Sequence, residues 1–105
     1  MTVFRRLLMT ATILSVLSCT GRTDKYVIGI SQCSEDSWRQ KLKEELEMAT
    51  YFNDGVTLLF ASANDDSQLQ QRQIDSLAAS GIDLLIVSPN QYDLMSAEID
   101  KVYDA

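Results

Sequence analysis

The run Leu84-Leu85-Ile86-Val87 decides the fold class of this chain of 105 residues, because a short continuous apolar run is typical of a strand that is buried on both faces. Tyr26–Ile30 and Val56–Ala61 have the same character, and the three runs begin 30 and then 28 residues apart. A polar loop and a helix-patterned stretch follow each run. This βαβαβα order predicts an α/β fold in which helices cover both faces of a parallel sheet, giving three layers.

The connections between the runs predict the order of the strands in the sheet. Crossovers between parallel strands are right-handed in nearly all proteins, and helices on both faces then favour the order 2-1-3, with Tyr26–Ile30 in the centre. Gly29 inside that strand predicts a close approach of a helix or of backbone. The strand Leu84–Val87 would lie at an open edge. We therefore expect residues 26–105 to be the first part of a lobe that belongs to a larger protein.

Three stretches repeat apolar residues at helical spacing, and each follows one of the strands. The first is expected to span Asp36 to Phe52. The second starts at Ser67, where Ser67 and Gln70 match a capping box, and it ends at Ser80-Gly81. The third runs into the last residues of the chain. The expected apolar stripes are Trp38, Leu42, Leu46 and Ala49 in the first helix, Leu69, Ile74, Leu77 and Ala78 in the second, and Leu94, Met95, Ile99 and Val102 in the third.

The first 19 residues carry the pattern of a processed signal rather than of a folded element. Arg5 and Arg6 form a basic start, and residues 7–18 form a largely apolar stretch of 12 residues, shorter than the roughly 18 that a membrane-spanning helix needs. The stretch runs into Val16-Leu17-Ser18-Cys19, which resembles a bacterial lipobox, so that Cys19 would become a lipidated N-terminus. An uncleaved anchor and an ordinary signal peptide are the alternatives. All three interpretations place the chain in the periplasm or cell envelope, with residues 20–25 as a tether.

Charge and cysteine content exclude two classes of protein. Removal of residues 1–18 leaves seven Lys and Arg against fifteen Asp and Glu, a net charge of −8, and no basic cluster remains. A chain this acidic does not attract nucleic acid. The two cysteines do not predict a disulfide framework, since Cys19 would carry the lipid. Cys33, just after the first strand, is expected to be a small, half-buried apolar filler, with a reactive thiol as the alternative.

The loops after the strands, Ser31–Ser37, Ser62–Asp66 and Ser88–Tyr92, are where a parallel sheet of this kind binds ligands. The first lacks the glycines of a dinucleotide fold, and the Gly-Lys-Ser/Thr of a phosphate-binding loop is absent. The loops contain no Lys or Arg, which disfavours a phosphorylated ligand. The chain has no histidine, the usual base of a hydrolytic triad and the commonest zinc ligand. We expect no enzyme activity, no metal and no cofactor.

What remains in these loops is neutral and acidic hydrogen-bonding capacity beside one large aromatic residue. Sugar hydroxyls both donate and accept hydrogen bonds, which suits amides and carboxylates, and the apolar face of a pyranose suits an indole. Simpler interpretations are helix capping and solvation for Asp65 and Asp66, core packing for Trp38, a turn for Asn90 and a helix-dipole partner for Glu35. The candidate ligand-binding residues are Gln32, Glu35, Ser37, Trp38, Asn64, Asp65 and Asn90.

Several segments resemble the first lobe of type I periplasmic binding proteins, a family that includes the ribose-binding-like sugar receptors. They are Tyr26–Gln32, Trp38, Ser62–Asp65 and Gly81–Asn90, of which the last is the most specific. Ser31–Arg39 is in addition similar to the sensor region of hybrid two-component histidine kinases.

The resemblance implies a clamp of two lobes that closes on a small solute, usually a sugar. By position, it assigns the solute contacts at the start of the first helix to Glu35, Ser37 and Trp38, and only Trp38 keeps the aromatic character of the family. The second lobe lies outside this sequence, so we expect no strong sugar binding by this chain alone.

Three functions remain open at this point. The first is extracytoplasmic binding of a small solute, which is passed to the permease of an ABC transporter or reported to a kinase core. The second is a flavodoxin-like small enzyme or cofactor carrier, which would need the phosphate-binding loop that is absent. The third is a cytoplasmic regulator of the same fold, which would need an N-terminal helix-turn-helix where this chain has a signal. The sequence favours the first.

Overall fold

A computed structural model of the chain describes residues 26–105, so the signal, the tether and Cys19 lie outside the described residues. Three strands alternate with three helices, as the pattern of apolar runs predicts. The elements are β1 (Tyr26–Gln32), α1 (Ser37–Tyr51), β2 (Val56–Ser62), α2 (Ser67–Ala79), β3 (Leu84–Ser88) and α3 (Tyr92–Asp104). All three strands run one or two residues further than their apolar runs, because pairing of the backbone continues after the side chains become polar.

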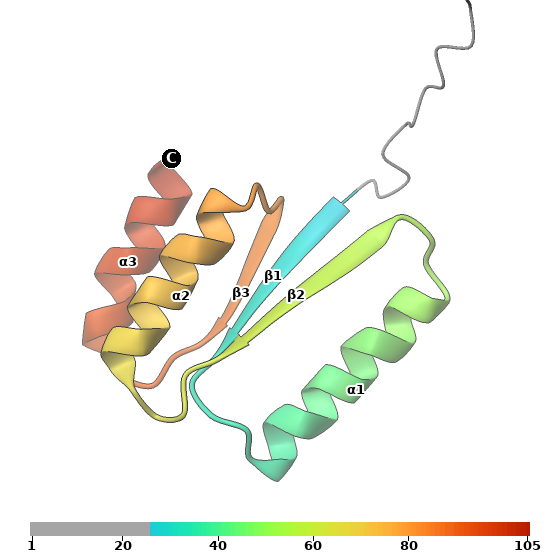
Figure 1. Cartoon of the computed structure of the whole chain (residues 1–105), viewed down its shortest axis with the longest axis horizontal. Coiled ribbons are helices and arrows are strands. Elements are labelled where there is room, and N and C mark those ends of the chain that lie inside the picture. Colours follow the sequence, from blue (N-terminus) through green and yellow to red (C-terminus); the bar gives the residue numbers. More distant parts are fainter. Residues whose placement is uncertain (1–25) are drawn as a thin grey trace, which may run out of the picture.

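The sheet has the predicted topology. Both neighbours of β1 run parallel to it, and the strand order is β2-β1-β3. In the register of these pairs, the last residue of β1, Gln32, lies opposite Ser62 on one side and Ser88 on the other. Figure 1 shows α1 on one side of the sheet and α2 with α3 on the other. The prediction of a three-layer α/β sheet with helices on both faces is therefore confirmed.

The best-packed part of the molecule lies between the sheet and α2. Ile74 and Leu77 of α2 are buried, as expected, and Met95 of α3 is fully buried beside this layer. Lys101 of α3 forms an ion pair with Asp75 of α2, with 2.7 Å between Nζ and Oδ1, and so joins the two helices at the surface. Burying an apolar side chain of this size is worth about 1.5–3 kcal/mol, so this layer supplies most of the stabilisation.

The opposite layer is looser than the sequence predicts. No residue of α1 is buried, and of its expected stripe only Leu42 and Leu46 are half-buried, while Trp38 and Ala49 are exposed. The physical reason is the position of the helix. It lies on the face opposite α2 and α3 (Figure 1) and packs chiefly against the edge strand β2, so its stripe makes few contacts with β1 and β3.

The start of α2 corrects a second expectation. The capping box of Ser67 and Gln70 does not form: the N-cap is Asp66, whose Oδ1 accepts the backbone N–H of Leu69 at 2.9 Å. The carboxylate one residue earlier in the chain takes the capping role, since it reaches the free N–H groups of the first turn. Gln70 is thereby left to turn inward, where it is fully buried.

Gly29 permits the close contact between β1 and the segment that leads into β3. A Cβ atom at this position would lie 3.0 Å from Cδ1 and 3.3 Å from Cγ2 of Ile82. It would also lie 3.5 Å from Cβ of Leu77. Any larger residue in the centre of β1 would therefore push against Ile82, as the sequence predicted for a glycine in this strand.

We predict that Gly29→Val lowers the free energy of unfolding by about 1–3 kcal/mol, because the added methyl groups overpack this contact. Urea unfolding followed by circular dichroism measures the loss. Ile82→Ala makes room for the valine, so the double variant should lose less than the sum of the two single losses. Strictly additive losses would show that Ile82 is not the neighbour that excludes a side chain at position 29.

Candidate functional site

The loops that follow the three strands meet at the carboxyl edge of the sheet. The backbone N–H of Cys33 donates to the carbonyl of Ser88 at 3.0 Å, and that of Ala63 donates to the carbonyl of Gln32 at 3.0 Å. The N–H of Asp65 donates to the carbonyl of Cys33 at 2.7 Å. These bonds join all three loops. We call Ser31–Ser37, Ser62–Asp66 and Ser88–Tyr92, together with Trp38 and Arg39 of the first turn of α1, the rim.

Asn90 ties two loops of the rim together. Its Nδ2 donates to the carbonyl of Asp65 at 2.9 Å and to Oγ of Ser67 at 2.8 Å. Both N–H bonds of the amide are thereby used within the protein. Only the carbonyl oxygen of this amide is left for an outside molecule, and an oxygen of this kind accepts hydrogen bonds but cannot donate them.

Asn64 and Asp65 form the tip of the loop after β2. Both are exposed, and both have a positive φ, 49° at Asn64 and 62° at Asp65. Asn and Asp tolerate this left-handed conformation better than other residues with a side chain. The cap of α2 is the next residue, Asp66, so of the capping and solvation expected for this pair, capping falls to Asp66, and the carboxylate of Asp65 is open to solvent.

Gln32 has a different place from the one expected of a ligand-binding side chain. It is buried, and its Nε2 donates to the backbone carbonyl of Arg39 at 3.2 Å. This bond joins the end of β1 to the first turn of α1. Gln32 therefore holds the start of the first rim loop in place from the buried side.

Glu35, Ser37 and Trp38 lie exposed where the first loop enters α1. The side chain of Trp38 is 66% exposed, so it is not part of the core. The guanidinium of Arg39 lies over its ring, with Cζ 5.8 Å from the ring centroid. This distance is within the range of a cation–π contact.

Arg39 is a rim residue that the sequence argument missed. Its Nε donates to Oγ of Ser88 at 3.1 Å, and its guanidinium pairs with the carboxylate of Asp36. The loops themselves contain no Lys or Arg, but Arg39, in the first turn of α1, brings a guanidinium to their edge. The spacing of Asp36 and Arg39, three residues apart at a helix start, was the signal available.

Asp36 caps α1 and anchors that guanidinium. The pKa of its carboxyl lies below the usual value of 3.8, chiefly because the backbone N–H of Arg39 donates to it. Desolvation opposes this effect, and the charge and side-chain hydrogen bond of Arg39 add to the lowering. The carboxylate is therefore ionised at neutral pH and holds Arg39 across the rim.

Gln70 of α2 is the second residue that the sequence argument missed. Its side chain forms hydrogen bonds with Ser31, Ser88 and Asn90, and so connects the end of β1 with the end of β3 and the loop after it from the buried side. Its spacing to Ile74 and Leu77 places it on the buried face of α2, and this periodicity could have identified it. The match to a capping box pointed to the surface instead.

Cys33 is buried, with 5% of its surface exposed, and its thiol is free. This supports the filler interpretation, although the residue is more deeply buried than expected. Among residues 26–105, no group of His, Cys, Asp and Glu could hold a metal ion. In the same part of the chain, no helix is long and apolar enough to cross a membrane.

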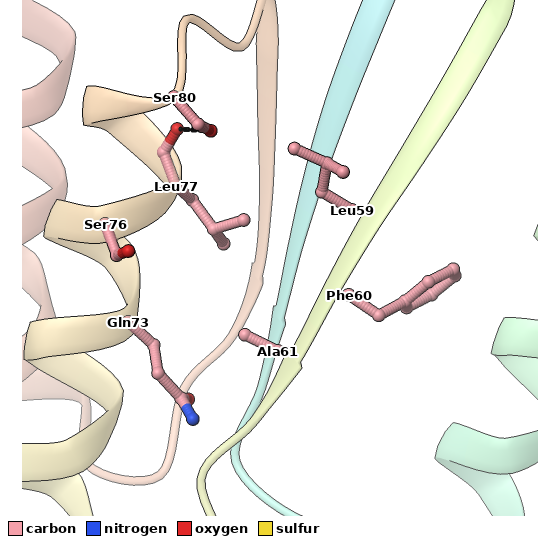
Figure 2. Close-up of a pocket in the computed structure, with 7 residues that line it drawn as sticks. All are labelled: Leu59, Phe60, Ala61, Gln73, Ser76, Leu77 and Ser80. Atoms are coloured by element: carbon pink, nitrogen blue, oxygen red, sulfur yellow. Dashed lines mark hydrogen bonds between the residues drawn. The ribbon is translucent and has the colours of Figure 1, made fainter.

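A groove of about 320 Å³ lies between β2 and α2 and runs from near Ser62 toward Leu59 and Ser80. Figure 2 shows Leu59, Ala61 and Leu77 around it, while Phe60 points to the other side of β2, toward α1. Gln73 also lines the groove and donates from Nε2 to the carbonyl of Ser62 at 2.8 Å. The walls carry few polar groups, so this groove lacks the set of donors and acceptors that the rim offers to a hydroxylated solute.

No protein-family model and no curated protein matches the chain, but solved structures do. The fructose-binding periplasmic domain of the hybrid two-component system BT1754 is 35% identical, with a TM-score of 0.73 over 75% of this chain and 26% of that one. A solute-binding protein of an ABC transporter from Bacillus halodurans, with bound myo-inositol, is 22% identical, with a TM-score of 0.70 over 81% of this chain and 30% of that one.

A third structure, a solute-binding protein of an ABC transporter from Mycobacterium smegmatis with bound glycerol, is 22% identical. Its TM-score is 0.66 over 72% of this chain and 26% of that one. The chain thus spans between about a quarter and a third of the length of the structures it matches. All three are described as binding proteins and none as an enzyme. The chain has the fold of part of a lobe of a type I periplasmic binding protein, as its sequence resemblance implied.

We predict that Asp36→Ala removes a stabilisation that depends on pH. Because the pKa of Asp36 is lowered in the folded chain, its contribution is present at pH values above the usual 3.8 and is lost as the pH falls through the folded-state pKa. Urea unfolding of the two chains between about pH 7 and pH 2 should therefore give curves that converge toward acid. A difference that stays constant over that range would contradict a stabilising role for the ionised carboxylate.

Proposed function

We propose that the chain forms part of one lobe of an extracytoplasmic receptor for a small polyhydroxylated solute, most simply a sugar. The observation that carries this proposal is the rim, where exposed Trp38, exposed carboxylates and the free carbonyl of Asn90 meet at one edge of the sheet. The likeness to periplasmic domains described as binding fructose, myo-inositol or glycerol supports it.

The chemistry of the rim suits hydroxyl groups. Glu35 and Asp65 offer acceptors, Arg39 offers donors next to Ser88, and Trp38 offers an apolar ring face. A hydroxyl group can use either kind of partner, whereas a phosphate or carboxylate would meet the acceptors as repulsive neighbours. One arginine already paired to Asp36 does not offset these acceptors.

A role in sensing is favoured over uptake. The match at 35% identity is to a domain of a hybrid two-component system, whereas the two transport proteins, at 22%, share only the fold. The stretch from Ser31 to Arg39 carries the same likeness in the sequence. We propose that the solute is reported to a kinase core, with delivery to a permease as the second candidate.

We predict that the full chain binds fructose weakly, with a dissociation constant in the millimolar range or above. The binding free energy is then no more favourable than about −4 kcal/mol. Part of one lobe makes only part of the contacts, so calorimetry that gave micromolar affinity would contradict the proposed division into two lobes. NMR titration should place the shift changes on the rim and on the indole N–H of Trp38.

Trp38→Leu should abolish those shift changes. The matched control is Tyr103→Leu, which removes an exposed aromatic side chain from α3 and should leave the titration unchanged. Equal loss in both variants, or shift changes that concentrate on the groove between β2 and α2, would remove the rim from the proposal.

Attachment to the membrane through Cys19 is the second part of the proposal. Expression in a bacterium supplied with radiolabelled palmitate should label the chain, and Cys19→Ser should abolish the label. Cys33→Ser is the matched control, because Cys33 is buried at the rim and should not affect labelling. Labelling that persists in Cys19→Ser would exclude the lipobox, and an unlabelled chain in the membrane fraction would favour an uncleaved anchor.

A further inference from the structure

Gln70 joins the end of β1 to the end of β3 and the loop after it from the buried side of the sheet. It is fully buried at the start of α2. Its Nε2 donates to Oγ of Ser31 at 3.1 Å and to the carbonyl of Ser88 at 3.0 Å. Its Oε1 accepts the backbone N–H of Asn90 at 2.9 Å. Both donors and the acceptor of the amide are used, and one side chain spans β1, the end of β3 and the following loop.

The position of Asn90 depends on this bond and on a second set of contacts made by its own side chain. The side chain of Gln70 accepts the backbone N–H of Asn90, while Nδ2 of Asn90 donates to Asp65 and Ser67. Because the backbone and the amide nitrogen are both fixed, the amide cannot rotate to present its N–H groups. Asn90 therefore offers an outside molecule a hydrogen-bond acceptor and no donor.

We infer that Gln70 is a positioning residue for the solute site: it fixes the loop of Ser88–Tyr92 and, through it, presets Asn90 as an acceptor for a hydroxyl group of the solute. This inference rests on the proposed function of the rim. The inference goes beyond the proposed function, because it names a buried residue that fixes Asn90 as a hydrogen-bond acceptor without contacting the solute.

The exchange of amide hydrogen with solvent tests the inference without any ligand. In the 15N-labelled full chain, held in zwitterionic detergent micelles, Gln70→Met keeps a side chain of similar length but removes the amide and all three bonds. The amide of Asn90 should then exchange about tenfold faster or more, since a bonded amide must open before it exchanges. Amides in the centre of β1 should change far less.

Gln71→Met is the matched control. Gln71 is the next residue of α2, and its Nε2 donates to the carbonyl of Leu94 at 3.1 Å, which is a contact between helices away from the rim. This variant should leave the exchange of Asn90 as in the unchanged chain. Unaltered exchange of Asn90 in Gln70→Met, or equal acceleration of every strand amide, would overturn the inference, because the side chain would then be inert or merely part of the core.

A measurement on the unchanged chain covers the case in which Gln70→Met does not fold. The side-chain NH2 group of Gln70 should stay protected in D2O, while that of the exposed Gln68 on the same helix exchanges at once. Rapid exchange of the Gln70 NH2 group would refute the network directly.

The affinity for a solute is a second measurement, which a purely structural role of Gln70 would leave unchanged. With fructose as the probe, Gln70→Met should weaken binding by about tenfold, while Gln71→Met should not, although each variant loses hydrogen bonding within the chain. Equal affinity in Gln70→Met would overturn the role in positioning. Absence of fructose binding in the unchanged chain would count against the proposed function, whereas the exchange of Asn90 would still decide whether Gln70 holds the loop.

Discussion

The parallel pairing of β1 with a strand on each side is the constraint on which the rest of the structure depends. All three strands run in one direction. Every connection must therefore return along a face of the sheet to its starting end, and every loop after a strand begins at the same edge. The register places Gln32 opposite both Ser62 and Ser88, so the three polar strand ends lie in one row. The rim is a consequence of this pairing and needs no contact between the helices on the two faces.

The two helix layers contribute unequally to the site. On one side, α2 packs tightly and sends Gln70 to the strand ends. On the other, α1 is half-exposed along its length, but its first turn is held by Asp36, Arg39 and Gln32. Polar bonds thus fix α1 where it meets the rim, although apolar packing does not fix the rest of it. The exposed indole of Trp38 is placed by this first turn.

Most of the fold could be read from the sequence, because the apolar runs and their spacing are properties of local segments. The strands, their order and the need for Gly29 all followed from such patterns. The site was only partly accessible. Residues that follow a strand could be found, but Arg39 lies one turn into a helix and Gln70 approaches from the opposite layer. Both act through contacts between residues 18 to 49 positions apart, as in Gln70 with Ser88 and Arg39 with Ser88. A local pattern can place such a residue on a buried face or a first turn, but it does not record its distant partner.

The central place of β1 also has a consequence for how the chain acquires its structure. The strand that is first in the sequence is the middle one in space, and its nearest partner begins 30 residues later, at Val56. It cannot form a hairpin with what directly follows it, and pairing over such separations is slow because the intervening loop must first be ordered. Residues 37–51 can form α1 locally, whereas β1 has no strand to pair with until Val56 and the residues after it are available. The rim therefore cannot take shape before the two later strands have joined the first.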